Sequence, residues 1–170
     1  MAQLVDRLRS GSAASATGAC VAIEALRAQC LFMARMGKPM KCPPLISVAA
    51  RAGLIPPLVA LFAKGGHAAT WAGWTLSYTC TSRDIAGQLP AGCREAPSDV
   101  LADLAAGRAV FLTAGGVEAA AELLALPLRH PGLEALPTLR MALVTAFALL
   151  SELVRDFGGD RAFKVSDDHY

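Results

Sequence analysis

Apolar residues recur at intervals of three and four near the C-terminal end of this chain. Between residues 137 and 154 they stand at Leu139, Leu143, Ala146, Phe147, Leu150, Leu153 and Val154. This spacing places side chains on one face of a helix. A glycine pair at 158–159 is typical of a helix end. The pattern therefore predicts a long amphipathic helix over 137–154.

The middle of the chain predicts three more helices separated by glycine turns. The clearest spans 68–82, and its seam consists of Ala69, Ala72, Leu76 and Cys80. A glycine pair precedes it, as in a turn. A shorter helix over 55–64 opens with two prolines, which are tolerated there because the first amides of a helix have no intrahelical acceptor. A still shorter helix over 44–52 ends at Gly53.

This order of short, medium and long helix recurs later in the chain. Residues 52–62 align with 114–124, so that Gly115 follows Gly53 by 62 residues. Apolar residues coincide in the pairs Ile55/Val117, Val59/Ala121, Leu61/Leu123 and Phe62/Leu124. The N-terminal segments 4–8 and 19–26 look like the last two helices of a third copy. The sequence therefore predicts a helical array that opens inside a repeat.

The offset of 62 residues exceeds the roughly 40–47 residues of HEAT and armadillo repeats. The excess falls in segment 88–107, which contains two prolines and is interpreted as an insertion. Its second half predicts one short helix with Ser98 as the N-cap. The expected organisation is a partial repeat over 1–36, a central repeat over 44–86, an insertion over 87–107, a C-terminal repeat over 108–157 and a flexible tail over 158–170.

The central repeat resembles the armadillo repeat family. Residues 52–62 read AGLIPPLVALF and residues 72–77 read AGWTLS, similar to the family pattern AGxIPxLVxLL … AxWxLSN. The resemblance implies an all-α, right-handed superhelix (an α-solenoid) of two to two and a half repeats. It also implies that the long third helices line a concave groove that holds extended peptides.

The resemblance also identifies which groove positions differ from the family. In members that bind nuclear-import signals, a Trp and an Asn four residues later clamp the peptide. Here Trp74 matches, but the Asn position holds Tyr78. The corresponding pairs are Phe147 and Ser151 in the C-terminal repeat, and Glu24 and Ala28 in the N-terminal one. Because this ladder is not preserved, we do not expect an import receptor.

The function expected from these patterns is a non-catalytic protein–protein interaction scaffold. A peptide or partner segment would lie along the concave face, with candidate contacts at Glu24, Arg27, Trp74, Ser77, Tyr78, Phe147 and Ser151. For Trp74 and Tyr78 a groove position and a core position are equally supported, whereas Trp71 is expected in the core. The alternative is a structural or regulatory subunit, or fragment, of a larger helical-repeat assembly, which would self-associate through its open N-terminal repeat.

Composition and charge narrow the range of partners. Hydrophobic residues make up 54% and aromatic residues only 6% of the chain, so alanine dominates and favours helices. The net charge is +2, and Arg35, Lys38 and Lys41 form only a loose basic cluster. Nucleic-acid binding needs a denser basic stripe, and it is not expected. The longest apolar run, 141–150, is about half of a membrane span, which predicts a soluble protein.

Candidate chemistry is weak throughout the chain. Five cysteines form no CxxC pair and the three histidines are dispersed, so no metal site or cofactor is expected. Reduced, mostly buried thiols favour a cytoplasmic location, with a nuclear one as the alternative and organelle targeting not expected. Ser77, Cys80 and His67 lie near one another in sequence, but no acid is placed to orient the histidine. An enzyme is therefore the least favoured class.

Overall fold

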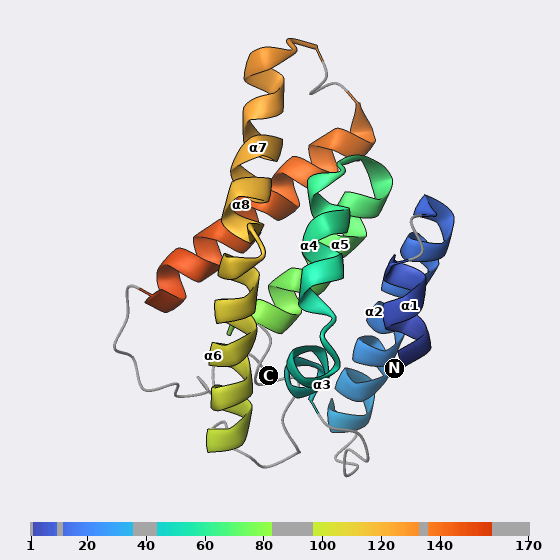
Figure 1. Ribbon diagram of the computed structural model, residues 1–170, viewed down its shortest axis with the longest axis vertical. Helices are drawn as coiled ribbons and strands as arrows, with labels where there is room; N and C mark the ends of the chain where they lie inside the picture. The colour runs from blue at the N-terminus through green and yellow to red at the C-terminus, as the bar shows by residue number, and fades with distance from the viewer. Residues whose placement is uncertain (1, 10–11, 36–43, 83–96, 133–135, 158–170) are drawn as a thin grey trace.

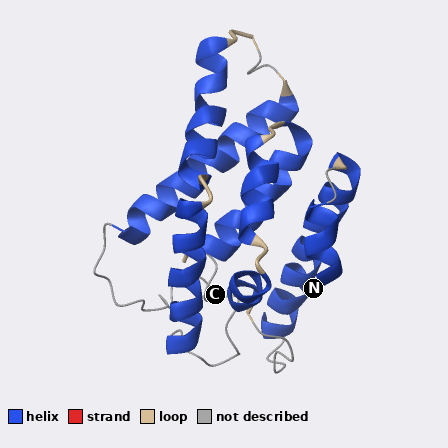
Figure 2. Ribbon diagram, viewed as in Figure 1, coloured by secondary structure: helices blue, strands red, loops and turns tan. Residues whose placement is uncertain are grey.

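The computed structural model describes residues 2–9, 12–35, 44–82, 97–132 and 136–157, apart from the side chains at 2, 13, 26, 27 and 29–35. Every regular element within these ranges is an α-helix, which confirms the all-α prediction (Figure 2). The eight helices of the described part are α1 Ala2–Arg9, α2 Ala13–Arg35, α3 Leu45–Ala52, α4 Ile55–Ala63, α5 Gly66–Cys80, α6 Ser98–Thr113, α7 Gly116–Arg129 and α8 Pro137–Phe157.

The two glycines aligned by the repeat occupy the same kind of turn. Gly53 follows α3 with φ 67°, and Gly115 follows α6 with φ 78°. Glycine adopts this left-handed conformation without the steric cost that a Cβ atom imposes. After Gly53, the Leu54 amide donates to the Ala49 carbonyl at 3.1 Å, which closes the helix end. The next helix then begins immediately, with Pro56 in its first turn.

The first helix of the C-terminal half differs from the prediction. The sequence pattern predicted a short helix within the insertion 87–107 and a separate repeat from 108, but α6 is one continuous helix of 16 residues. It has Pro97 at its N-cap position and no side-chain capping hydrogen bond, so Ser98 is not the N-cap. Gly107, taken as a boundary, lies buried inside α6. A Cβ atom there would stand 3.1 Å from Ile55 Cδ1, so the glycine permits close helix packing.

Helices α1 and α2 pack against the group α3 to α5, and this group packs in turn against α6 to α8 (Figure 1). The third helix of the central group, α5, lies between α2 and α8. In the same way α4 packs against α1 and α7, and α3 packs against α6. Helix α5 is therefore central to the packing, because it contacts α2, α3, α4, α6 and α8.

The central helix α5 buries most of its side chains, including hydroxyl groups. Ala69, Ala72, Leu76 and Cys80 are fully buried, which confirms the predicted seam. Thr75 Oγ1 donates to the Trp71 carbonyl at 2.9 Å, and Thr79 Oγ1 donates to the Thr75 carbonyl at 2.9 Å. Because these hydroxyls bond to carbonyls of their own helix, the hydrogen bonds offset the desolvation cost of burying them among apolar neighbours.

An ion-pair network joins the C-terminal ends of α5 and α8 to the interior of α6. Asp156 pairs with Arg108, and it accepts a hydrogen bond from the Ser82 amide at 2.8 Å. Arg108 Nε also donates to the Cys80 carbonyl at 3.0 Å, where α5 leaves a carbonyl without a helical partner. The Asp156 side chain is only 7% exposed. The network therefore fastens the last turn of α5 to its neighbours.

The buried face of α8 is not the one that the periodicity suggested. Leu139, Ala146 and Leu153 are buried as expected, but Phe147 is 66% exposed and Val154 is 72% exposed. The face that packs inward also includes Ala142, Thr145 and Leu149. Because α8 carries apolar residues around most of its circumference, periodicity alone predicted the helix but not the side that it buries.

By length and composition alone, α8 is long and apolar enough to cross a membrane. The sequence pattern had predicted a soluble protein, because its longest apolar run covers only about half of a span. The same test admits the bent pairs α3 with α4 and α6 with α7, if each pair were one span. In the fold α8 packs along α5 and carries Arg140, Glu152, Arg155 and Asp156. It lies against other helices along one side and exposes apolar residues along the other.

Candidate functional site

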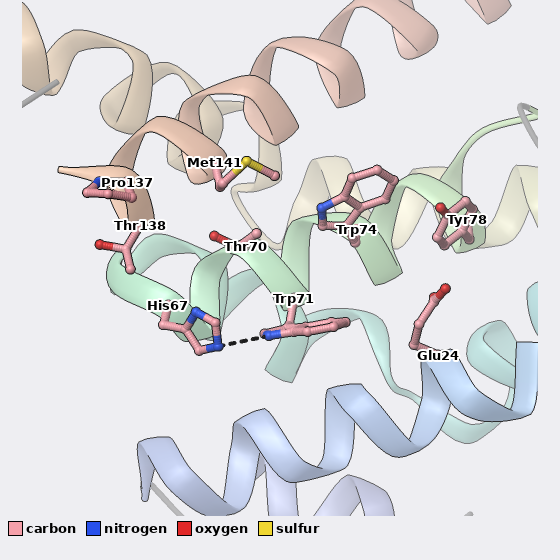
Figure 3. A pocket seen from close by; sticks show the side chains of 9 residues that line it. All are labelled: Glu24, His67, Thr70, Trp71, Trp74, Tyr78, Pro137, Thr138 and Met141. Carbon is pink, nitrogen blue, oxygen red and sulfur yellow. Dashed lines mark hydrogen bonds between the residues drawn. The ribbon is translucent and has the colours of Figure 1, made fainter. Parts of the chain in front are cut away.

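A pocket of about 530 Å³ opens between α2, α5 and α8. Nine residues line it: Glu24 from α2; His67, Thr70, Trp71, Trp74 and Tyr78 from α5; and Pro137, Thr138 and Met141 from α8 (Figure 3). The chain has only two tryptophans, and both are here. The walls are therefore mainly aromatic and aliphatic, as in most sites that bind a ligand or a partner side chain.

The spacing of residues along α5 produces the aromatic wall. Positions 67, 71, 74 and 78 are three or four residues apart and therefore share one face of the helix. Trp71 Nε1 donates a hydrogen bond to His67 Nε2 at 3.1 Å, and the two rings meet edge to face at 83°. Trp74 and Tyr78 have ring centroids 6.0 Å apart. These contacts hold the side chains in a defined arrangement before any partner arrives.

Gly73 brings the wall contributed by α8 close to α5. A Cβ atom at this position would lie 2.6 Å from Thr145 Cγ2 and 2.8 Å from Phe62 Cε2. The absence of a side chain thus allows α8 to approach α5 closely. As a result Met141 and Thr138 face the rings of α5 across the pocket (Figure 3).

Two polar groups of the pocket wall are placed to contact a ligand. Thr70 is 8% exposed, and its hydroxyl oxygen has no hydrogen-bond partner among the described residues. A buried hydroxyl without a partner costs free energy, which a ligand atom would recover by bonding to it. Glu24 extends from α2 toward the end of the pocket that Tyr78 occupies (Figure 3). It adds a carboxylate at the rim of an otherwise apolar site.

The structure brings together only part of the site expected from the sequence. Glu24, Trp74 and Tyr78 line the pocket. Ser77 does not, because it is 2% exposed and its hydroxyl donates to the Trp74 carbonyl at 2.8 Å. Phe147 and Ser151 are exposed on another face of α8, outside the residues that line the pocket. Arg27 belongs to α2, but its side chain lies outside the described residues.

Six lining residues were not among those expected. His67, Thr70, Trp71, Pro137, Thr138 and Met141 complete the pocket wall. Trp71 was expected in the core, and it does pack against the core while its other side faces the pocket. The helical spacing from Trp74 back to Trp71 and His67 was a usable signal. Nothing in the sequence indicated which residues of α8 would face α5.

The groups considered for catalysis are committed to other contacts. Burial raises the pKa of the Cys80 thiol to about 12, and burial raises the pKa of the Cys20 thiol to about 11. Thiols with such values are almost entirely protonated at neutral pH and are poor nucleophiles. His67 accepts its hydrogen bond from Trp71 rather than from Ser77 or Cys80. Among the described residues, no three His, Cys, Asp or Glu side chains are grouped so that they could hold a metal ion.

No protein-family model, no curated protein and no solved structure matches this chain.

Proposed function

We propose that this chain is a non-catalytic protein–protein interaction scaffold with an armadillo-like arrangement of helices. The stacking of α5 between α2 and α8, and of α4 between α1 and α7, supports such an array. The pocket opens between α2, α5 and α8, which would be the third helices of the three sets in such an array. We place the protein in the cytoplasm, with the nucleus as the alternative.

The observation that carries the proposal is the aromatic pocket with its unpartnered hydroxyl. An apolar or aromatic side chain of a partner segment would enter between Trp71, Trp74 and Met141. A polar atom of the segment would bond to the Thr70 hydroxyl. Aromatic residues in such central pockets are frequent binding hot spots, each worth about 2 kcal/mol or more. Binding of this kind makes and breaks no covalent bond.

The test is selection of a displayed peptide library on the folded chain, followed by titration of the selected peptides. Because both tryptophans line the pocket, their fluorescence reports binding directly. The variant Met141→Glu places a charge in the pocket at a residue that is already 45% exposed. We expect it to abolish binding of the selected peptides. Val154→Glu is the matched control, since Val154 is 72% exposed on α8 and does not line the pocket.

Unchanged peptide binding by Met141→Glu would contradict the proposal. Peptides that bind Met141→Glu as tightly as the original chain would show that the pocket is not the binding site. A Trp74→Ala variant separates binding from stability, because Trp74 is only partly buried. If that variant unfolds while still binding peptides at low temperature, the residue belongs to the core and not to a binding groove.

A second function is favoured by a different observation. The two ends of the helix stack expose apolar side chains, including Phe147, Val154 and Leu128 on the C-terminal side. Such surfaces are typical of interaction sites. We therefore keep, as the alternative, a structural or regulatory subunit of a larger helical-repeat assembly. It predicts that the isolated chain associates and that no peptide is selected by the pocket.

A further inference from the structure

The outer face of α2 is a continuous stripe of small, uncharged residues. It consists of Ala14, Gly18, Val21, Ala25 and Ala28, and all five are exposed. Their spacing of four, three, four and three residues places them on one side of the helix. That side is opposite the buried residues Ala16, Ala19 and Ile23, which pack inward. A Cβ atom added at Gly18 would meet nothing within 4 Å, so this face is open.

The outer face of α8 is a row of exposed residues with the same spacing, and Phe147 is its bulkiest apolar member; this row is called the ridge below. Arg140, Val144, Phe147, Ser151 and Val154 are all exposed. Val144 is 55% exposed, Phe147 is 66% exposed and Val154 is 72% exposed. Because α5 packs against both α2 and α8, and the stripe and the ridge lie opposite the buried faces of these helices, the two surfaces face away from α5. Protruding side chains on one helix and small residues on another are the surfaces that pack as ridges into grooves.

The internal contact between α5 and α8 is also made by small residues. Where α5 meets α8, Gly73 faces Thr145, and the buried residues of α8 include Ala142 and Ala146. The α2 stripe thus has the composition of an internal helix contact, but it faces outward. Since α2, α5 and α8 already stack in that order, an α2 from a second copy placed on α8 would continue the stack.

Charge on the neighbouring helices favours the same pairing. In the stack, α4 packs between α1 and α7, so a second copy placed in this way brings its α1 toward α7. Helix α1 carries two arginines and one aspartate, whereas α7 carries two glutamates and one arginine. The two helices therefore have net charges of opposite sign, which selects head-to-tail contact over contact between two identical ends.

We propose that this chain self-associates head to tail, with the Phe147 ridge of α8 in one copy packed on the Gly18–Ala25 stripe of α2 in the next. The occupant of both end faces is thus a second copy of the chain. The contact uses two different surfaces and does not close a symmetric pair, so it builds open chains of copies whose mean size grows with concentration. The groove of one copy would then continue into that of the next. This contact does not depend on whether the pocket binds a peptide.

The test is sedimentation velocity on the full chain over a range of concentrations, with two complementary variants. Gly18→Glu with Ala25→Glu blocks the α2 stripe, and Phe147→Glu with Val154→Glu blocks the α8 ridge. All four positions are exposed, so we expect the fold to survive, and circular dichroism checks that it does. Ala60→Glu with Ala63→Glu is the matched control, at exposed positions on α4.

We expect the original chain and the control variant to grow in mean mass with concentration, and each blocked variant to remain monomeric. An equimolar mixture of the two blocked variants should form one-to-one dimers and nothing larger, because each variant retains one working face. If the stripe-blocked variant dimerises alone, the contact is symmetric and the proposal is wrong. A chain that stays monomeric at every concentration also overturns it and leaves the end faces to a different partner. Ser151→Arg tests the ridge with a milder change if the double variant misfolds.

Discussion

Helices α3 to α5 and helices α6 to α8 share an apolar pattern but bury different parts of it. In the aligned pairs, Ile55, Val59, Leu61 and Phe62 are all buried in the first group. Of their counterparts only Leu123 is fully buried, while Val117 is 37% exposed and Ala121 is exposed. Among the described helices, the first group packs against α1 and α2 on one side and against the second group on the other, whereas the main contacts of the second group are with the first.

This difference shows what burial in a helix stack depends on. A repeat unit cannot cover its own apolar face, so coverage comes from the next unit along the stack. The second group keeps apolar residues for such a contact on α7 and α8, and among the described helices none covers them. The apolar pattern therefore indicates which faces can pack, and position in the stack decides which of them do.

The largest difference in stability loss between the two groups is expected when matched β-branched residues are replaced by alanine. Ile55 is 1% exposed and Val117 is 37% exposed. We expect Ile55→Ala to lower the free energy of unfolding by about 3–4 kcal/mol, because it leaves a cavity among packed helices. Val117→Ala should cost about 0.5 kcal/mol or less. Urea unfolding followed by tryptophan fluorescence at low protein concentration measures both. Equal costs would show that the second group is covered as completely as the first.

A second large effect is expected at the ion pair that joins α6 to α8 within the second group and is hydrogen-bonded to the end of α5. Asp156→Ala would leave the Arg108 guanidinium, which is 17% exposed, without its carboxylate. We expect a loss of about 3 kcal/mol in the free energy of unfolding, as for ion pairs in mostly buried sites. The control is Arg129→Ala, whose pair with Glu122 lies on the surface within α7 and should matter far less. Chemical denaturation measures the free energy of unfolding of both variants. If Asp156→Ala leaves this free energy unchanged, the ion-pair network does not stabilise the fold.

Two glycines on neighbouring helices should respond in opposite directions to the same substitution. Gly73→Ala places a Cβ atom 2.6 Å from Thr145 Cγ2, so we expect it to destabilise the fold by about 1–3 kcal/mol. Gly18→Ala meets nothing within 4 Å and should stabilise α2 by up to about 1 kcal/mol, because alanine favours helices. Thermal unfolding of the two variants measures the sign directly. The same sign for both would contradict the close approach of α5 and α8.

The smallest effect concerns the surface pair between α3 and α6. The hydroxyl of Ser47 and the guanidinium of Arg51 lower the pKa of Asp103. The charged form is thus favoured in the folded state, so its contribution to stability is present at neutral pH and is lost as pH falls through the lowered pKa. Asp103→Asn should be slightly less stable than the original chain at pH 7, and the difference should start to shrink below about pH 4 and vanish only below the lowered pKa of Asp103. Denaturation at several pH values checks this, and a difference independent of pH would exclude an electrostatic origin.

Local features of the sequence were sufficient to locate most of the helices. The aligned glycines Gly53 and Gly115 both form left-handed turns, because few other residues adopt that conformation at low cost. The prolines in the first turn of α4 marked its start. Gly107 was the exception, since it resembled a break but lies inside α6 against Ile55. A glycine needed for a turn and one needed for close packing look alike until the neighbouring helix is known.

The candidate site was predicted only where it depends on a single helix. Trp74 and Tyr78 share a face of α5, and their proximity follows from helical spacing alone. Met141 and Thr138 could not be predicted, since they reach the pocket only because Gly73 lets α8 approach α5. Phe147 was expected to contact a partner in the groove; it is 66% exposed on α8 but does not line the pocket. How far a helix is rotated about its axis depends on all of its neighbours.

The sequence by itself determined that this protein is helical, where most helices begin and end, and that an apolar pattern recurs along it. These properties follow from backbone preferences and periodicity, which act over a few residues. The tertiary structure decided which face of α8 is buried, which polar groups are left without partners, and that two tryptophans meet a methionine from α8 across one pocket. These properties depend on contacts between residues far apart in the chain, for which local preferences carry no information.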